Sequence, residues 1–324
     1  MKAWIWYETE KKPVLKEIND PDISTPDETR VDVLYSSINH RDVWISKGKY
    51  PKIKLPCVLG SDACGLSEGR HVILNPGFAW GKNEKVQSEL YHILGMPTNG
   101  TFAEKVVVEK RQLHEKPGHL SPEEAASIPL AGVTAFRAFV LKCNPLPGQK
   151  VLITGIGGGV SQWVMLFAKA LGCEIFVTST SPEKLKRAKN LGVSDGVCTL
   201  DKNWPVTLKT KSGGVDIVID SVMGPLLPEL IKICNPGASL CFYGASGGVT
   251  QEFQPHVLFW RQISIYGSTM GSDLDFRNMV DFINKHKITP VVDSIFSFKN
   301  LPLAFERMEA SAQFGKIIID HSRT

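Results

Sequence analysis

The stretch from Val151 to Leu171 constrains the fold more than any other part of the chain. Residues 151–154 are apolar or β-branched and predict a short buried strand, which ends at the glycine-rich run 155–159. A helix is expected next, because apolar residues recur at offsets of three and four: Val160, Trp163, Val164, Phe167, Ala168 and Leu171. Glycines let a backbone approach closely, and free N–H groups at a helix start attract an anion. The segment therefore predicts a phosphate site, although a tight turn without a ligand has the same pattern.

A second strand is expected at residues 174–178, followed by the small, neutral residues 179–181. In NAD-binding sheets this position usually carries Asp or Glu, which bonds the ribose hydroxyl. A carboxylate would repel a 2′-phosphate, whereas Lys184 and Arg187 in the next helix would attract one. The pattern favours NADP over NAD. The alternative for these two cations is a solvated helix face.

Local patterns divide the chain into two regions. Up to about residue 120, short β-branched or alternating segments separated by prolines indicate a barrel-like or sandwich domain. From about residue 148, apolar strands alternate with helices, which is typical of a doubly wound parallel sheet. The last residues, 316–320, are expected to form a strand.

Composition sets looser limits. A chain of 324 residues holds two domains, and a net charge of +4 with dispersed cations indicates neither a nucleic-acid binder nor a membrane anchor. No apolar run is long enough to cross a bilayer and no signal peptide is evident, so a cytoplasmic location is expected. The seven cysteines are scattered without a C-x-x-C pair and are interpreted as reduced core residues.

Several longer motifs are specific enough to indicate a family. They are Asn39-His40-Arg41-Asp42, Gly60-Ser61-Asp62, residues 99–104 and 129–135, the glycine run 155–160, Asp220-Ser221-Val222, residues 267–271, and Phe314-Gly315-Lys316. In these motifs and their order, the chain resembles the medium-chain dehydrogenase/reductase superfamily, and within it the zinc-free quinone oxidoreductase-like branch. The resemblance implies an α/β protein with a GroES-like, β-rich catalytic domain at residues 1–120 and 267–324. A Rossmann domain with a doubly wound parallel sheet would occupy residues 121–266, and the active site would lie in the cleft.

The resemblance also bears on metal binding. Zinc-dependent relatives hold a catalytic metal through Cys, His and Cys at positions that look like Asn39, Ser61 and Leu130. An amide, a hydroxyl and an alkyl group do not make a tight zinc site, and residues 75–101 contain no Cys for a structural site. No metal is therefore predicted.

A reaction without a metal suits acceptors that spread the developing charge. When hydride adds to a quinone or an α,β-unsaturated carbonyl, conjugation spreads the developing negative charge. Addition to a simple ketone instead builds a localised alkoxide. The predicted activity is NADPH-dependent reduction of such conjugated small molecules. Asn39 is expected to donate its amide to the substrate oxygen, and Tyr50, if it is not a surface aromatic, to donate a proton. Asp42 is expected to orient its neighbours.

On the cofactor side, the resemblance places Thr134 beside the nicotinamide and puts three residues of the glycine turn at the pyrophosphate: Gly155, Gly158 and Val160. Ser181 and Lys184 would hold the 2′-phosphate, and Tyr243, Gly244, Phe314 and Lys316 would surround the rest. For Tyr243 and Phe314 the alternative is core packing. A homodimer is expected through the apolar strand at residues 263–266.

Three departures from the family pattern are visible. Ser161 stands at the third glycine place of the helix turn, and Thr199 stands where several NADPH-binding relatives have Tyr. The segment 65–70 is also shorter than usual. Two alternatives to the quinone reductase therefore stay open: an NADPH-dependent enoyl-thioester reductase, and a catalytically idle dinucleotide-binding protein with a structural or interaction role.

Overall fold

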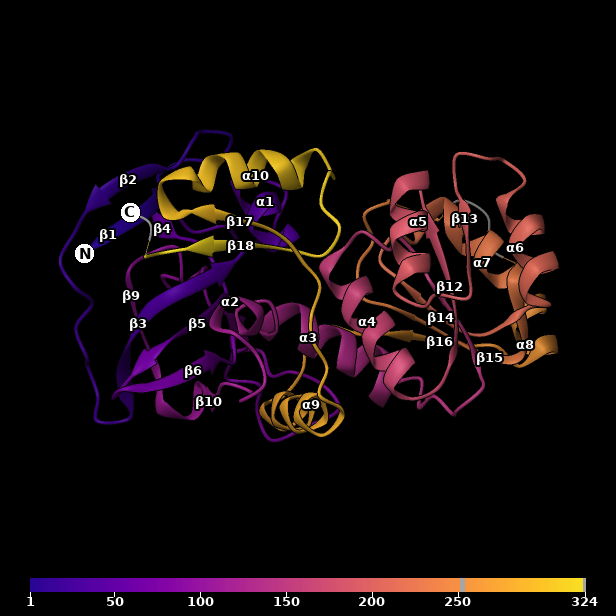
Figure 1. Ribbon diagram of the computed structural model, residues 1–324, viewed down its shortest axis with the longest axis horizontal. Helices are drawn as coiled ribbons and strands as arrows, with labels where there is room; N and C mark the ends of the chain where they lie inside the picture. The colour runs from indigo at the N-terminus through magenta and orange to yellow at the C-terminus, as the bar shows by residue number, and fades with distance from the viewer. Residues whose placement is uncertain (251–253, 323–324) are drawn as a thin grey trace. The chain divides into compact units, whose positions relative to one another are not determined.

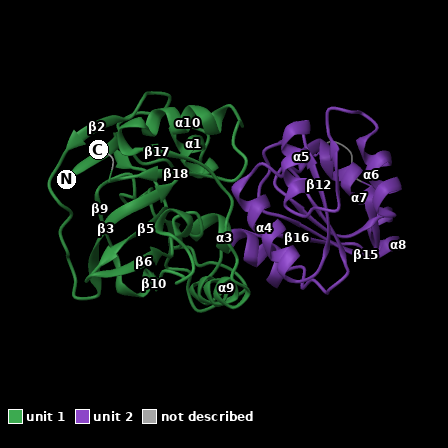
Figure 2. Cartoon of the chain, in the orientation of Figure 1, with its two compact units in different colours: residues 1–133, 271–324 green, residues 134–270 purple. Residues whose placement is uncertain are grey.

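The computed structural model describes residues 1–250 and 254–322. The chain divides into two compact units, residues 1–133 with 271–324 and residues 134–270 (Figure 2). Residues 121–133 thus fall in the first unit and 267–270 in the second, whereas the sequence analysis assigns them the other way round. The first difference arises because helix α2 (Pro122–Ala125) packs on strands of the first unit and because Gly132 lies against Met279. The second arises because the Ser268 amide donates to the Phe242 carbonyl.

The first unit is built on a seven-stranded sheet in the order β10-β6-β5-β3-β18-β17, with β9 also paired to β3 (Figure 1). All of its pairs are antiparallel except β17 with β18. The strands are β3 (Glu28–Ser37), β5 (Asp62–Ser67), β6 (Arg70–Leu74), β9 (Lys105–Glu109), β10 (Leu113–Glu115), β17 (Val292–Ser297) and β18 (Lys316–Asp320). Smaller sheets pair β1 (Lys2–Trp6) with β2 (Val14–Glu17) and β4 (Cys57–Val58), and β7 (Gly77–Phe78) with β8 (His92–Ile93).

The helices of the first unit come from both ends of the chain. They are α1 (His40–Ser46), α2, most of α3 (Pro129–Ala135), α9 (Asp273–His286) and α10 (Leu301–Glu309), with short 3₁₀ turns at Lys110–Gln112 and Phe298–Asn300. Helix α9 begins with a capping box in which Ser272 accepts from the Asp275 amide, as expected of a Ser followed by acids.

The C-terminal strand lies in the middle of the first unit. All five residues of β18 are buried, and Ile318 pairs with Ser37 of β3. A continuous apolar run suits a strand that is covered on both faces. This pairing brings the start of β18 next to the end of β3, where helix α1 begins.

The segment 65–70 is a regular tight hairpin. Ser67 pairs with Arg70, and the two turn residues Glu68 and Gly69 have φ values of 49° and 75°. Positive φ at both central positions is the geometry that best matches the twist of two antiparallel strands.

The second unit contains a six-stranded parallel sheet in the order β13-β12-β11-β14-β15-β16, which confirms the predicted doubly wound fold. The strands are β11 (Lys150–Ile153), β12 (Glu174–Ser179), β13 (Asp195–Cys198), β14 (Val215–Asp220), β15 (Cys234–Phe242) and β16 (Ser264–Gly267). The helices are α4 (Gly159–Ala170), α5 (Pro182–Asn190), α6 (Trp204–Ser212), α7 (Leu227–Ile233) and α8 (Pro255–Arg261), with a π-helix at Phe136–Leu141 and a 3₁₀ turn at Gly224–Leu226. Strand order reverses at β11, between β12 and β14. Among the described residues, no helix is long and apolar enough to cross a membrane.

Candidate nucleotide-binding and active-site residues

The glycine run after β11 forms the turn into helix α4. Gly155 has a φ of 61°, a value that suits glycine, and Gly158 is the N-cap residue of α4 in extended conformation. The Gly158 amide donates to the Gly155 carbonyl at 3.0 Å, which closes the turn. Because the first N–H groups of a helix have no partner within it, those at the start of α4 are suited to an anion. The turn and the start of α4 bring Gly155, Gly158 and Val160 together, and their contact with a pyrophosphate stays a prediction.

Ser161 is accommodated at the third glycine place. Its side chain is buried, and its hydroxyl donates to the Thr154 carbonyl at 3.0 Å and lies 3.3 Å from the Tyr243 hydroxyl. Burial raises the pKa of the Tyr243 phenol, and the hydroxyls of Ser161 and Ser221 oppose that shift. Ser161 thus adds a hydrogen bond from its side chain to the turn, which a glycine at this place could not make.

Asp220 ends strand β14 beside this turn. Its carboxylate accepts from the Thr154 hydroxyl at 2.5 Å and from the amides of Val222 and Met223 at 3.0 and 2.6 Å. Burial raises the pKa of Asp220, while these hydrogen bonds act against the shift. Asp220 therefore ties the end of β11 to the loop after β14. The sequence analysis uses Asp220 only as a family landmark, although an acid at the carboxyl end of a parallel strand was a signal for such a role.

The remaining expected cofactor residues of the second unit lie at the ends of helices or strands or at a helix start. The Ser181 hydroxyl accepts from the Lys184 amide at 3.3 Å and so caps helix α5. Thr134 is buried and donates to the Met270 sulfur at 3.6 Å. A Cβ at Gly244 would lie 2.9 Å from the Ser221 carbonyl oxygen, so this position has little room for a side chain.

A second polar cluster lies in the first unit, around Lys316. Its side chain is only 3% exposed, and its ammonium donates to the Ile38 carbonyl at 2.9 Å, to Asn39 Oδ1 at 2.6 Å and to Asp62 Oδ2 at 3.0 Å. The three acceptors match the three N–H groups of an ammonium. Lys316 and Asn39, which the sequence analysis assigns to cofactor and substrate respectively, are thus direct partners.

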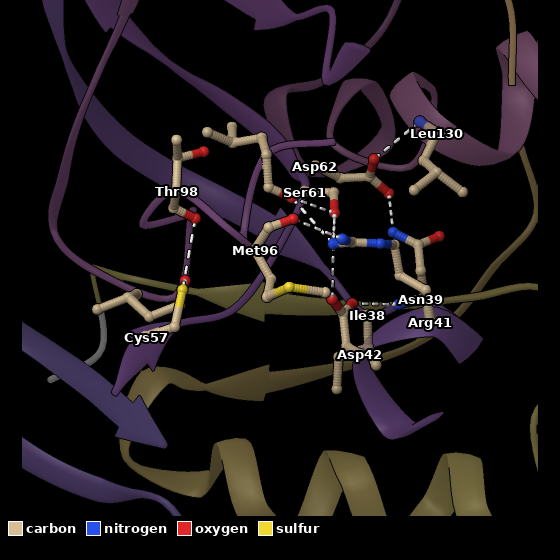
Figure 3. A network of polar contacts seen from close by, with 12 residues as sticks. Ile38, Asn39, Arg41, Asp42, Cys57, Ser61, Asp62, Met96, Thr98 and Leu130 are labelled. Carbon is tan, nitrogen blue, oxygen red and sulfur yellow. Dashed lines mark hydrogen bonds and ion pairs between the residues drawn. The ribbon is translucent and has the colours of Figure 1, made fainter. Parts of the chain in front are cut away.

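Asp62 is the counter-ion of this cluster. Figure 3 shows its carboxylate between the Leu130 backbone and the Asn39 side chain. Its Oδ1 accepts from the Leu130 amide at 2.8 Å, and its Oδ2 accepts from Asn39 Nδ2 at 2.9 Å and from the Ser37 hydroxyl at 2.7 Å. With the Lys316 bond, this buried carboxylate is fully hydrogen-bonded, as a buried charge must be. The role of Asp62 in this cluster was not predicted, because the sequence marks it only as part of the family motif Gly60-Ser61-Asp62 and does not reveal its partners.

Arg41 and Asp42 follow Asn39 on helix α1 and are also buried. The Arg41 guanidinium donates to the Ser61 hydroxyl and to the carbonyls of Leu94 and Met96 at 3.0–3.1 Å (Figure 3). Asp42 Oδ2 accepts from the Asn39 amide at 2.9 Å. Burial raises the pKa of Asp42 to about 6, and nearby Arg41 opposes the shift. Asp42 is therefore a helix-capping residue at the start of α1.

Tyr50 and Phe314 complete the set. Tyr50 is half-buried against the apolar core, and its ring centroid lies 5.3 Å from the Arg41 guanidinium carbon. Phe314 is 1% exposed, and its amide donates to Asp293 Oδ1 at 2.8 Å. Phe314 thus packs in the core of the first unit, as the alternative interpretation holds.

The fold and the glycine turn define a two-unit protein of the dinucleotide-binding oxidoreductase class, and comparison with known proteins identifies its family. The family model described as "Alcohol dehydrogenase GroES-like domain" matches residues 25–118, and the one described as "Zinc-binding dehydrogenase" matches residues 159–285. The chain is 30% identical to the zinc-type alcohol dehydrogenase-like protein YogA of Leptosphaeria maculans, over 91% of each chain. It is 26% identical to an acryloyl-coenzyme A reductase of Sulfurisphaera tokodaii, over 94% of this chain and 95% of that one. A crystal structure described as an NAD-dependent alcohol dehydrogenase has a TM-score of 0.92 at 32% identity and 99% coverage of both chains.

The chain belongs to the medium-chain dehydrogenase/reductase superfamily, and it is an oxidoreductase of that family. The predicted pairing of a GroES-like domain with a Rossmann domain is confirmed.

Proposed function

We propose that this chain is a zinc-independent reductase that uses NADPH to reduce a quinone or an α,β-unsaturated carbonyl compound. The observation that carries the proposal is the buried ammonium of Lys316, which lies 2.6 Å from Asn39 Oδ1. Asn39 stands where zinc-dependent relatives are expected to have a metal-binding Cys. Because the Lys316 ammonium already lies beside Asn39, a divalent metal ion at the same position would be repelled.

The donor set around Asn39 does not fit zinc. Ser61 donates its hydroxyl to the Leu94 carbonyl at 2.8 Å and also accepts from Arg41, and Leu130 offers only an alkyl group. The described residues contain no group of three His, Cys, Asp or Glu side chains that could hold a metal ion. Zinc sites in proteins use thiolate, imidazole and carboxylate ligands, so an amide, a hydroxyl and an alkyl group do not substitute for them. The zinc named in the family description and in the YogA relative is therefore not proposed for this chain.

The residues of the second unit fit a phosphorylated dinucleotide. The glycine turn offers helix N–H groups to a pyrophosphate, and the residues between β12 and α5 carry no carboxylate that would repel a 2′-phosphate. Lys184, in the first turn of α5, supplies a positive charge at this point, next in the chain to the exposed carboxylate of Glu183. When bound, the reduced nicotinamide supplies the hydride.

Residues of the first unit are proposed to bind the substrate oxygen and to donate the proton. Asn39 retains one amide N–H beyond the one given to Asp62, and that N–H is the proposed donor to the substrate oxygen. A single neutral donor suits an acceptor in which conjugation disperses the developing charge. Tyr50 is the proposed proton donor, and Asp42 holds the start of helix α1 through the Asn39 amide.

An enoyl thioester is the nearest competing substrate, because the acryloyl-coenzyme A reductase aligns with nearly the whole chain. An acceptor panel separates the possibilities. NADPH oxidation is followed at 340 nm with ortho-quinones, para-quinones, 2-alkenals, crotonyl-coenzyme A and simple ketones, before and after treatment with EDTA.

We expect turnover of the conjugated acceptors that is unchanged by the chelator, together with substoichiometric metal by elemental analysis. A dependence on the coenzyme A handle would assign the enoyl-thioester activity instead. Turnover of simple ketones that EDTA abolishes would refute the proposal. Tight NADPH binding with no turnover of any acceptor would identify an idle binding protein.

A further inference from the structure

The amide of Asn39 is held in one orientation by charged groups on both sides. Its Oδ1 accepts from the Lys316 ammonium, and its Nδ2 donates to the Asp62 carboxylate at 2.9 Å. Turning the amide over would place its NH₂ against the ammonium and its oxygen against the carboxylate, which are two repulsive contacts. The remaining N–H of Nδ2 therefore has a fixed direction before any substrate arrives.

The bond from Lys316 to Asn39 is the shortest of the three that the ammonium makes, at 2.6 Å against 2.9 and 3.0 Å. Short hydrogen bonds with a charged donor are roughly twice as strong as neutral ones. They are stronger still at a buried site such as this one, where Lys316 is 3% and Asn39 is 6% exposed. A cation at the carbonyl oxygen of an amide draws electron density from the nitrogen, so the N–H groups become better donors.

We propose that Lys316 is a positioning residue that polarises the Asn39 amide and so makes its remaining N–H a strong donor to the substrate oxygen. This inference rests on the proposed function, and it adds a positive charge that acts directly on the amide proposed to bind the substrate oxygen. Asp62 forms an ion pair with the ammonium and keeps the amide oriented. The Asp62 carboxylate accepts hydrogen bonds from four donors: Ser37, Asn39, Lys316 and the Leu130 amide.

Three substitutions at one position separate charge from hydrogen bonding. Lys316→Arg keeps a cationic donor, Lys316→Gln keeps a neutral N–H donor, and Lys316→Met removes both. Lys105→Gln is the matched control, because Lys105 forms an ion pair with Asp20 on the surface of the same unit. Folding of each variant is checked by circular dichroism and thermal denaturation.

With the best acceptor from the panel, we expect Lys316→Gln to lower kcat by at least about tenfold, with the Kd for NADPH changed less than threefold. Lys316→Arg should retain kcat to within about threefold, and Lys105→Gln should match the unmodified protein. A folded Lys316→Gln variant with unchanged kcat would overturn the proposal.

A second measurement does not depend on turnover. The side-chain amide signals of Asn39 are assigned in a ¹⁵N spectrum by their loss in Asn39→Asp. We expect them at unusually low field in the unmodified protein and displaced upfield in Lys316→Gln, but not in Lys105→Gln. Unshifted signals would overturn the inference even if the enzyme is active, whereas shifted signals in a protein without turnover would mean that only the proposed function fails.

Discussion

Lys316 Nζ lies 2.6 Å from Oδ1 of Asn39, although the two residues are 277 positions apart in the chain. The antiparallel pairing of Ile318 with Ser37 brings them together, because it sets the first residue of β18 beside the second residue after the end of β3. The C-terminal strand thereby contributes the buried cation to a site whose other members come from the first 130 residues. Removing that strand would take away the cation and the centre of the sheet together.

Asp42 predicts a specific dependence of stability on pH. Its pKa is raised from 3.8 to about 6, so in the acid range the folded state binds a proton more tightly than the unfolded state does. The stabilisation from this proton is present at low pH and is lost as the pH rises from about 4 through about 6. Asp42→Asn cannot lose a proton and should escape this loss.

The difference between the two proteins is the measured quantity. From pH 4.5 to 7.5, the unfolding free energy of the unmodified protein should fall relative to Asp42→Asn by about 2 kcal/mol, as measured by urea denaturation. Asp22→Asn, at an exposed position, is the control and should give a constant difference. A difference between Asp42→Asn and the unmodified protein that does not vary with pH would contradict the burial argument.

Thr154 should be needed for both stability and cofactor binding. Thr154→Val removes the only described hydroxyl that donates to the Asp220 carboxylate, at a position that is 1% exposed. Leaving a buried carboxylate short of one donor costs about 1–3 kcal/mol of unfolding free energy. The altered turn should also weaken NADPH binding severalfold. Thr154→Ser retains the hydroxyl and should lose less than about 1 kcal/mol by urea denaturation. A loss in Thr154→Ser as large as the loss in Thr154→Val would contradict a specific role for the hydroxyl.

The elements that could be predicted from the sequence are those with a strong local pattern. The strand expected at 174–178 lies within β12, and the one expected at 316–320 coincides with β18, because each contains an unbroken apolar run. Helix α6 gave no such signal, since its buried residues are only Trp204, Leu208 and Ser212 among exposed lysines. The part of the site that depends on a single segment, the glycine turn, was predictable from the sequence. The part formed by distant residues was not predictable, because no local pattern reveals that Lys316, Asn39 and Asp62 are partners.

Lys184 should set the preference for NADPH. Its place in the first turn of α5, next to the Ser181 cap, puts a cation near the proposed 2′-phosphate position. Lys184→Ala should weaken NADPH binding about tenfold and leave NADH binding unchanged, because only NADPH carries the extra phosphate. Lys186→Ala, at an exposed position of the same helix, is the control. Titration followed by tryptophan fluorescence measures both affinities, and an equal loss for the two cofactors would remove Lys184 from the proposed phosphate site.

The outer strand of the parallel sheet is the proposed dimer contact. β16 ends the strand order of the described sheet, so one of its edges has backbone N–H and C=O groups open to another strand. Helix α8 precedes β16 and exposes Phe259 and Trp260 by 71% and 82% of their surfaces. Exposed aromatic side chains such as these are typical of an interface, in which such residues carry much of the binding energy.

Trp260→Glu should therefore convert a dimer into a monomer without unfolding it, because an exposed side chain contributes little to the fold. Leu303→Glu, on helix α10 of the first unit and 50% exposed, should leave the dimer intact. Light scattering coupled to gel filtration at micromolar concentration measures the mass of each protein. A monomeric unmodified protein would end the proposal of a dimer. A Trp260→Glu variant that stays dimeric would place the contact elsewhere, since a buried glutamate opposite its symmetry mate costs several kcal/mol.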